Sequence, residues 1–154
     1  MIRATGGGLG ALLLSALPAL AGTLSVTLDD GTAIARLAAP EGAGWCILWN
    51  HSVQLFEVED CYVNDRGRMV LKRSHLPDFA AGLDHIPGRG RQVSDGRGGY
   101  WIEDIDEPVP GNAYVLRTGG PKVDHRIRMG DTLISLTGAA ERARVHIALI
   151  PDRN

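Results

Sequence analysis

Hydrophobic and polar residues alternate along most of this chain, and this period of two limits the folds that the chain can adopt. In the segment 23–28, for example, Leu24, Val26 and Leu28 alternate with residues that carry small hydroxyl side chains. Successive side chains of a β-strand point to opposite faces, so the pattern is typical of strands with one buried face. No segment carries a sustained apolar stripe with the 3.6-residue period of a helix. The sequence therefore predicts an all-β protein.

Turn-forming residues divide the chain into short predicted strands. The turn Asp29-Asp30-Gly31 predicts an opening hairpin between the strands at 23–28 and 34–37. Further strands are predicted at 45–49, 56–63, 69–71, 100–102, 113–117, 126–129, 132–136 and 144–150. The glycine-rich segment 75–99 is predicted to be a long irregular excursion. About eight to ten short strands with turns at these intervals indicate an antiparallel β-sandwich or a partly closed β-barrel.

The first 21 residues have the composition of an export signal. Arg3 precedes an apolar run from Leu9 to Leu20, and the small residues Ala19 and Ala21 form a cleavage site. This run is about a dozen residues long, whereas a membrane-spanning helix needs roughly 20. We therefore expect a signal peptide at 1–21, one β-rich domain at 22–154, and a periplasmic or secreted location with no membrane span. An uncleaved anchor is the alternative.

The charge of the chain argues against nucleic acid as a partner. It has 16 basic and 18 acidic residues, with a formal net charge of −2. Such a balance provides no basic field that would attract a polyanion. We therefore interpret the Arg-Gly stretches at 88–91 and 97–99 as surface loops and not as an RNA-binding tract.

The sequence contains no recognisable catalytic motif. His51 and Ser52 are adjacent, but neighbours on a strand point to opposite faces, and no Gly-x-Ser-x-Gly elbow occurs. The five histidines are scattered without a His-x-His or Cys-x-x-Cys spacing, so no metal or cofactor is predicted. The acidic residues at 57–60 and 103–107 could serve a glycosidase only across a cleft, and we interpret them as a solvated acidic surface.

One stretch of the chain resembles a known family. Residues 49–53 read Trp-Asn-His-Ser-Val, Glu59 follows His51 by eight residues, and residues 80–83 read Ala-Ala-Gly-Leu. Together with His125 before a later strand, this resembles the bacterial family called domain of unknown function 1850, over residues 45–150. The chain departs from the family pattern at Gln54, where an acidic residue is common, and at Ala80, where glycine is common.

The resemblance implies a function without naming a reaction. Family members are similar to short exported proteins and are often encoded beside tripartite ATP-independent periplasmic (TRAP) transporters of the TAXI class. This implies a periplasmic accessory or binding module, whose partner would be a TAXI-type solute-binding protein or its TRAP permease, in the uptake of an organic acid or amino acid. The residues implied to bind are Trp49, His51, Ser52, Glu59, Gly82 and His125. The alternatives are a small periplasmic hydrolase that uses His51 or His125 with Glu59, and a structural envelope protein with no small ligand.

Strand parity relates the two segments that carry the first motif. If the segments 45–49 and 56–63 pair as antiparallel neighbours, their large side chains share one face only when paired residue numbers sum to an odd value. This register predicts that Trp45, Ile47 and Trp49 face the core with Phe56, Val58 and Tyr62.

The same register predicts that His51 and Glu59 lie on opposite sides of the sheet, since 51 and 59 sum to an even number. A β-bulge between Val53 and Glu57 would bring them together. We favour the ladder without a bulge, because it buries six large apolar side chains.

The register also places Cys46 opposite Cys61, close enough for a disulfide. An oxidising compartment favours such a bond. A continuous ladder, however, leaves Val53-Gln54 as a two-residue turn, and neither residue favours a tight turn. The sequence therefore leaves open whether the two cysteines are bonded.

Overall fold

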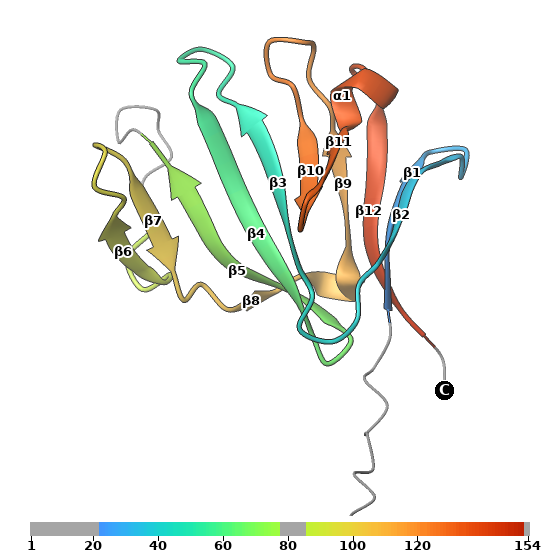
Figure 1. Cartoon of the computed structure of the whole chain (residues 1–154), viewed down its shortest axis with the longest axis horizontal. Helices are drawn as coiled ribbons and strands as arrows, with labels where there is room; N and C mark the ends of the chain where they lie inside the picture. The colour runs from blue at the N-terminus through green and yellow to red at the C-terminus, as the bar shows by residue number, and fades with distance from the viewer. Residues whose placement is uncertain (1–21, 78–85, 153–154) are drawn as a thin grey trace, which may run out of the picture.

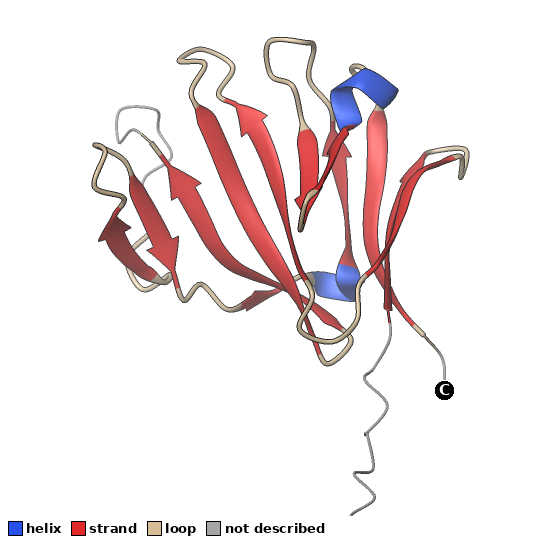
Figure 2. Ribbon diagram, viewed as in Figure 1, coloured by secondary structure: helices blue, strands red, loops and turns tan. Residues whose placement is uncertain are grey.

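The computed structural model describes residues 22–77 and 86–152. The predicted signal peptide at 1–21 and Gly82 lie outside the described residues. Twelve strands form two antiparallel sheets that pack as a sandwich and do not close into a barrel (Figures 1 and 2). The predicted all-β fold is confirmed, in its sandwich form.

The strands of the small sheet are, in spatial order, β2 (Ala33–Ala38), β1 (Gly22–Leu28), β12 (Arg144–Pro151) and β9 (Ala113–Arg117). Those of the large sheet are β11 (Thr132–Ser135), β10 (Arg126–Met129), β3 (Gly44–Asn50), β4 (Glu57–Asp65), β5 (Arg68–Leu76), β7 (Tyr100–Glu103) and β6 (Arg91–Ser94), and β8 (Glu107–Pro108) pairs with β5. The two short helical elements in these ranges are α1 (Leu136–Ala139) and a 3₁₀ turn at Pro110–Asn112. None of the helices in the described part of the chain is long and apolar enough to cross a membrane.

The predicted number of strands, eight to ten, was too low. The strand predicted at 69–71 continues to Leu76, and the excursion predicted at 75–99 contains β6, which pairs with β7. The sequence also gave no indication of the two-residue strand β8. These segments are short or irregular in pattern, so their pairing depends on neighbours that are distant in sequence.

The main core lies between the two sheets, where the alternating apolar positions of both meet. Leu24 and Val26 of β1 and Ile147 of β12 face Trp45 and Ile127 of the large sheet, and all five are at most 1% exposed. A second core lies under β4, β5 and β7, the strands of the large sheet farther from β1 and β2 in Figure 1. Its buried residues are Val58, Leu71, Leu76, Tyr100, Ile102 and Ile105.

The predicted register of β3 and β4 is confirmed, since Trp45 lies opposite Tyr62 and Trp49 opposite Val58. Both pairs sum to 107, as does every other pair of this ladder. The inward face also contains a charged residue between these apolar positions. Asp60 lies opposite Ile47 and accepts a hydrogen bond from the Ser74 hydroxyl. The interpretation of residues 57–60 as a solvated acidic surface was therefore wrong for Asp60, and it was also wrong for Glu59, which is 7% exposed.

We expect Asp60→Asn to raise the melting temperature at pH 7. Burial raises the pKa of Asp60, against the opposing effects of the Ser74 hydrogen bond and the Arg89 charge. A carboxyl whose pKa is raised in the folded state stabilises the fold below its unfolded pKa, and this contribution is lost as the pH rises through the folded value. Asparagine keeps an acceptor for Ser74 without the charge, so its advantage should shrink below about pH 4.

Thermal unfolding between pH 3.5 and 8 tests this expectation, with Asp65→Asn as the control on the same strand. Hydrogen bonds from Arg68 and Arg66 hold the pKa of Asp65 below its usual value, so that variant should gain nothing at pH 7. An Asp60→Asn protein that is less stable than the wild type at pH 7 would contradict the assignment.

Candidate functional site

The outward face of the large sheet carries a row of polar and aromatic side chains from three neighbouring strands. Glu59 on β4 lies opposite His75 on β5, and His75 lies opposite Trp101 on β7. Directly opposed residues of antiparallel strands share a face, so the three side chains stand side by side. This face is opposite to the one that packs on the small sheet.

A β-bulge is the reason why His75 faces outward. The pairing of β4 with β5 shifts by one residue at Lys72. Leu71 before the bulge and Leu76 after it both face the core, although odd and even positions of a regular strand lie on opposite faces. Without the shift, His75 would share the inward face of Leu71. The bulge therefore brings the imidazole next to Glu59.

Asp95, in the loop between β6 and β7, orients the His75 ring. Its Oδ2 lies 2.9 Å from His75 Nε2, and its Oδ1 accepts the backbone N–H groups of Arg97 at 2.7 Å and Gly99 at 3.0 Å. These hydrogen bonds lower the pKa of Asp95. A Cβ on Gly99 would lie 2.6 Å from Asp95 Oδ2 and 2.6 Å from Pro77 Cα, so glycine is required for this close approach. The loop is thus shaped to hold the carboxylate in place.

Trp101 forms a flat wall beside this pair. Its ring centroid lies 4.6 Å from that of His75, and the Arg73 guanidinium carbon lies 4.3 Å from the centroid of the indole. Such cation–π contacts restrict the orientation of the ring. The indole is therefore held between two side chains of β5.

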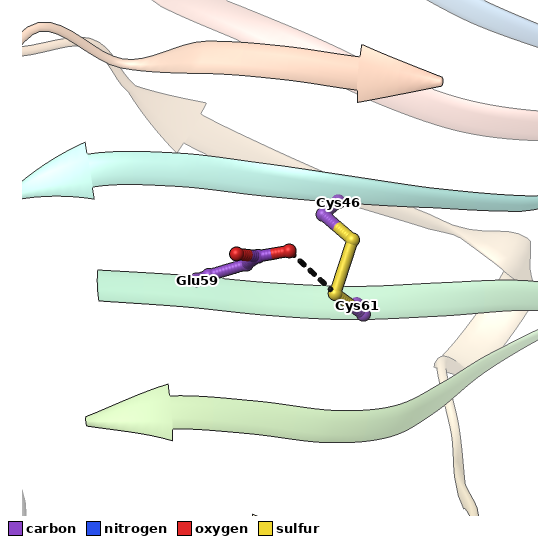
Figure 3. Close-up of side chains that lie close together, drawn as sticks. All are labelled: Cys46, Glu59 and Cys61. Carbon is purple, nitrogen blue, oxygen red and sulfur yellow. Dashed lines mark hydrogen bonds between the residues drawn. A yellow bond between two sulfur atoms is a disulfide. The ribbon is translucent and has the colours of Figure 1, made fainter. Parts of the chain in front are cut away.

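Glu59 is only 7% exposed and contacts two side chains. Arg128 on β10 donates a hydrogen bond to its Oε1. The same oxygen lies 3.1 Å from Cys61 Sγ (Figure 3). A disulfide joins Cys61 to Cys46 on β3. Since a disulfide sulfur has no proton, Cys61 could donate a hydrogen bond to Glu59 only in the reduced protein.

The ligand atoms of Cys46, Glu59 and Cys61 lie within 4.8 Å of one another, which is the kind of grouping that can hold a metal ion. Metal coordination by cysteine requires a thiolate. Both sulfurs are in the disulfide. This group is therefore not a metal centre in the oxidised protein.

A pocket of about 410 Å³ opens beside this row. Its volume falls in the range of small-molecule sites. The side chains that line it and can recognise a ligand are those of Glu57, Glu59, His75, Asp95, Arg97 and Trp101. Glu57 pairs with Arg126, at 2.9 Å between Oε2 and Nη2, whereas the Arg97 side chain has no hydrogen-bond or ion-pair partner among the described residues.

The residues implied by the family resemblance do not form one site. Trp49 stacks on His125 with ring centroids 6.2 Å apart, at the end of the sandwich where the β3–β4 loop, the β9–β10 loop and α1 lie together (top of Figure 1). His51 and Ser52 belong to the β3–β4 loop at the same end. Glu59 lies on the outward face. Its neighbouring histidine there is His75, and not His51 or His125 as the sequence suggested.

His51 and Glu59 are separate, as the ladder without a bulge predicts. The regular pairing of β3 with β4 extends from Gly44–Val63 to Asn50–Glu57. His51 lies just beyond it, where its Nδ1 accepts the backbone N–H of Gln54 at 3.1 Å and its ring stacks on Phe56. Its contacts are therefore those of a residue that shapes the loop.

His125 is 8% exposed and has no hydrogen bond to Glu59. Its Nδ1 accepts the backbone N–H of Gly119 at 2.9 Å, so the proton of the neutral ring is on Nε2. Burial lowers the pKa of His125, although the charge of Asp124 opposes this shift. The hydrolase hypothesis that pairs Glu59 with His51 or His125 thus has no geometric support.

Ser52 lines a second pocket, of about 490 Å³, at the loop end of the sandwich. Lys122 and Arg142 line it as well, from segments distant in the chain. Asn50 connects these loops, since its backbone N–H and its side chain donate to the carbonyls of Val123 and Lys122. The second pocket lacks the buried carboxylate and the oriented histidine of the first.

Sequence reasoning missed His75 and Asp95, which it assigned to the irregular excursion. The segment 94–99 reads Ser-Asp-Gly-Arg-Gly-Gly, in which an aspartate followed by glycines is typical of a loop that closes on the Asp side chain. That signal could have identified Asp95 as an anchor. No local signal could have identified its partner, because the orientation of His75 depends on the bulge.

Comparison with known proteins identifies the family alone. No curated protein and no solved structure matches the chain. The family model for a domain of unknown function (DUF1850) matches residues 46–136, which include β3 from Cys46 onward, β4, the bulge in β5 and the loop of Asp95. The chain therefore belongs to the DUF1850 family.

Proposed function

We propose that this protein is an exported, periplasmic binding module that takes a small organic carboxylate and assists a TAXI-type TRAP transporter in the uptake of an organic acid or amino acid. The composition of residues 1–21 supports export. The resemblance to a family often encoded beside such transporters supports the partner. The pocket on the outward face of the large sheet supports the ligand class.

The Arg97 guanidinium is the observation that carries the proposal. It lines a pocket in which Glu57 and Glu59 are already neutralised by Arg126 and Arg128, and in which Asp95 is bonded to His75. A guanidinium without an internal partner can bind a carboxylate, because the two groups have opposite charges and form two parallel (bidentate) hydrogen bonds. The Trp101 indole would cover the apolar part of the ligand. The amino group of an amino acid would find acceptors in Glu57 and Asp95.

Isothermal titration of the mature protein with a panel of small organic acids and amino acids tests the ligand. We expect one chemical series to bind, and Arg97→Ala to weaken that binding by about tenfold or more, since the lost charge-assisted contact corresponds to roughly 1.4 kcal/mol or more. Arg36→Ala is the matched control, because Arg36 is exposed on β2 in the small sheet. Equal weakening by both substitutions, or no binding by any member, would refute the proposed pocket.

The link to a transporter needs a separate experiment. Deletion of the gene should reduce transporter-dependent uptake of the ligand identified by titration, and the Arg97→Ala protein should restore uptake less well than the Arg36→Ala protein. Periplasmic fractionation should recover a chain that begins at Gly22. Normal uptake after deletion would reject the accessory role while leaving the binding result intact.

The His75–Asp95 pair favours a second candidate function, a hydrolase. A histidine oriented by a carboxylate is the arrangement of a general base. No serine, threonine or free cysteine lines the pocket within 22–77 and 86–152, so water would be the nucleophile. Turnover of an ester or amide of the bound acid, lost in His75→Asn but retained in His51→Asn, would select this function over simple binding.

A further inference from the structure

We propose that the Cys46–Cys61 disulfide is a redox-active centre that exchanges two electrons with a protein or small-molecule dithiol. The disulfide lies on the outward face of the large sheet, beside Glu59. A bond with a purely structural role needs no ionisable neighbours. This disulfide is in contact with the Glu59 carboxylate, and an arginine lies opposite each cysteine in the adjacent strand.

The two sulfurs differ in burial, which decides where an external thiolate attacks. Cys61 is 6% exposed, whereas Cys46 is only partly buried. Thiol–disulfide exchange requires access of the attacking thiolate to one sulfur. We therefore assign Sγ of the more exposed residue, Cys46, as the atom attacked, and Cys61 Sγ as the leaving group.

Arginines flank the disulfide in the adjacent strands. Arg128 on β10 lies opposite Cys46, and Arg73 on β5 lies opposite Cys61. Arg128 bonds to Glu59, and Arg73 extends over Trp101 with its Nη1 3.6 Å from Glu103. Arg128 therefore offsets the negative charge of Glu59, the carboxylate beside Cys61 Sγ, and a leaving thiolate departs faster when its charge is stabilised.

Glu59 is placed to handle the proton of Cys61. Its Oε1 lies 3.1 Å from Cys61 Sγ, within reach of the S–H group that exists only in the reduced protein (Figure 3). Glu59 is a positioning and proton-accepting residue for this thiol. The carboxylate would receive the proton when Cys61 becomes the attacking thiolate during re-oxidation.

The exchange proceeds in two balanced steps. A donor thiolate attacks Cys46 Sγ, a bond forms between donor sulfur and Cys46, and the Cys46–Cys61 bond breaks with its electron pair on Cys61, which takes up a proton. The second donor thiolate then attacks the donor sulfur of this mixed disulfide and releases Cys46, which also takes up a proton. The donor dithiol becomes a disulfide, and the protein gains two electrons and two protons.

The strands that carry the cysteines should remain paired after reduction. β3 is held by β10 on its other side and β4 by β5, so both stay in the interior of the large sheet. The β3–β4 ladder has six further residue pairs, two on one side of the disulfide (Gly44–Val63 and Trp45–Tyr62) and four on the other, from Ile47–Asp60 to Asn50–Glu57. Reduction can therefore occur in the native fold.

Reduction of the native protein by dithiothreitol, followed by alkylation and mass spectrometry, tests the proposal. We expect reduction to be at least about tenfold faster than global unfolding measured in the same buffer, with the far-UV circular dichroism unchanged. A reduction rate equal to the unfolding rate would overturn the proposal, since it would show that the sulfurs react only in the unfolded chain.

Two matched single-cysteine variants test the direction of attack. When an excess of the oxidised donor, a small-molecule disulfide, is added, the Cys61→Ser thiol at Cys46 should attack it, form a mixed disulfide and release one donor thiol. Cys46→Ser should form at least about tenfold less mixed disulfide through the buried Cys61. Equal trapping by both variants would overturn the assigned order of the two sulfurs. A circular dichroism spectrum matching the wild type for each variant ensures that the comparison concerns the native fold.

Glu59→Gln tests the proton-accepting residue through a pH profile. Re-oxidation of the reduced Glu59→Gln protein should be slowed about tenfold near pH 7, and the deficit should disappear at a pH where Cys61 ionises without help. Glu57→Gln is the control on the same strand and face, without a contact to sulfur. A uniform change at every pH, or the same change in both variants, would refute this role. None of these three experiments uses a carboxylate ligand. A negative result for the redox proposal is therefore distinct from a negative result for the proposed binding pocket.

Discussion

Replacing Trp45 with alanine is expected to lower the free energy of unfolding by about 3 to 5 kcal/mol. Trp45 is 1% exposed in the main core, and its ring stacks on Tyr62 with centroids 6.1 Å apart. Truncation removes these contacts and leaves a cavity that a sheet-on-sheet core cannot fill without moving strands. Urea unfolding, followed by circular dichroism, measures the loss.

Two further variants, compared with Trp45→Ala by the same unfolding experiment, test whether the loss comes from the buried indole. Trp45→Phe should cost less than Trp45→Ala, because it keeps an aromatic ring and removes an indole N–H that has no hydrogen-bond partner in the described structure. Trp49→Ala should also cost less, since Trp49 is only half-buried at the end of β3. A loss for Trp45→Ala below about 1 kcal/mol would show that the assigned core is wrong.

Removing the disulfide in a Cys46→Ala/Cys61→Ala double variant is expected to lower the free energy of unfolding by about 3 kcal/mol. The bond closes a loop with a sequence separation of 15 residues, and the chain-entropy estimate for a loop of this length is about 3 kcal/mol. The fold should persist, because a domain of this size has about 5 to 15 kcal/mol of stability. Urea unfolding of both proteins, with and without a reductant, measures the difference.

The reductant provides the internal control. It should destabilise the wild type toward the value of the double variant and leave the double variant unchanged. A wild type whose unfolding midpoint does not respond, although alkylation shows both thiols reduced, would contradict a stabilising role for the bond.

The alternation of apolar and polar residues predicted most of the fold, because it identifies the buried and the exposed face of each half-buried strand from local sequence alone. The positions of Trp45, Ile47 and Trp49, and those of Val58 and Tyr62, set a register that the structure reproduces. The same register places Asp60 on the inward face, between Val58 and Tyr62, but its acidic identity was interpreted as a sign of solvation. Its burial depends on Ser74, a partner in the next strand.

The objection that the sequence raised to the disulfide depended on an assumed tight turn. The β3–β4 ladder ends at Asn50–Glu57, so six residues connect the strands, and no two-residue turn is needed. Leu55 adopts a φ of 62°, and the His51 N–H donates to the Phe56 carbonyl at 2.8 Å. The cysteines can thus lie directly opposite each other without a two-residue turn. The strand register correctly predicted that Cys46 lies opposite Cys61. The turn preferences of Val53 and Gln54, however, could not predict the length of the loop.

The candidate site could not be predicted in the same way. Its residues come from β4, β5, β7 and the β6–β7 loop, and each pairing is set by contacts distant in sequence. A bulge was considered only in the β3–β4 ladder, where the structure is regular, whereas the shift occurs in the β4–β5 ladder. Because the segment 75–99 is rich in glycine, it was predicted to be irregular, and neither β6 nor the pairing of His75 in β5 was predicted.

The extra residue at Lys72 has a consequence for how this chain can tolerate changes of length. Deletion of Arg73 or Ser74, with the bulge kept, would exchange the faces of the residues that follow in the strand, and would turn Leu76 to solvent and His75 to the interior. Deletion of Lys72 itself would convert the ladder into a regular one with all faces kept. It would remove the ion pair of Lys72 with Asp106 and the carbonyl that accepts the Ile105 N–H. The chain can thus lose Lys72 without exchanging the two faces of the large sheet.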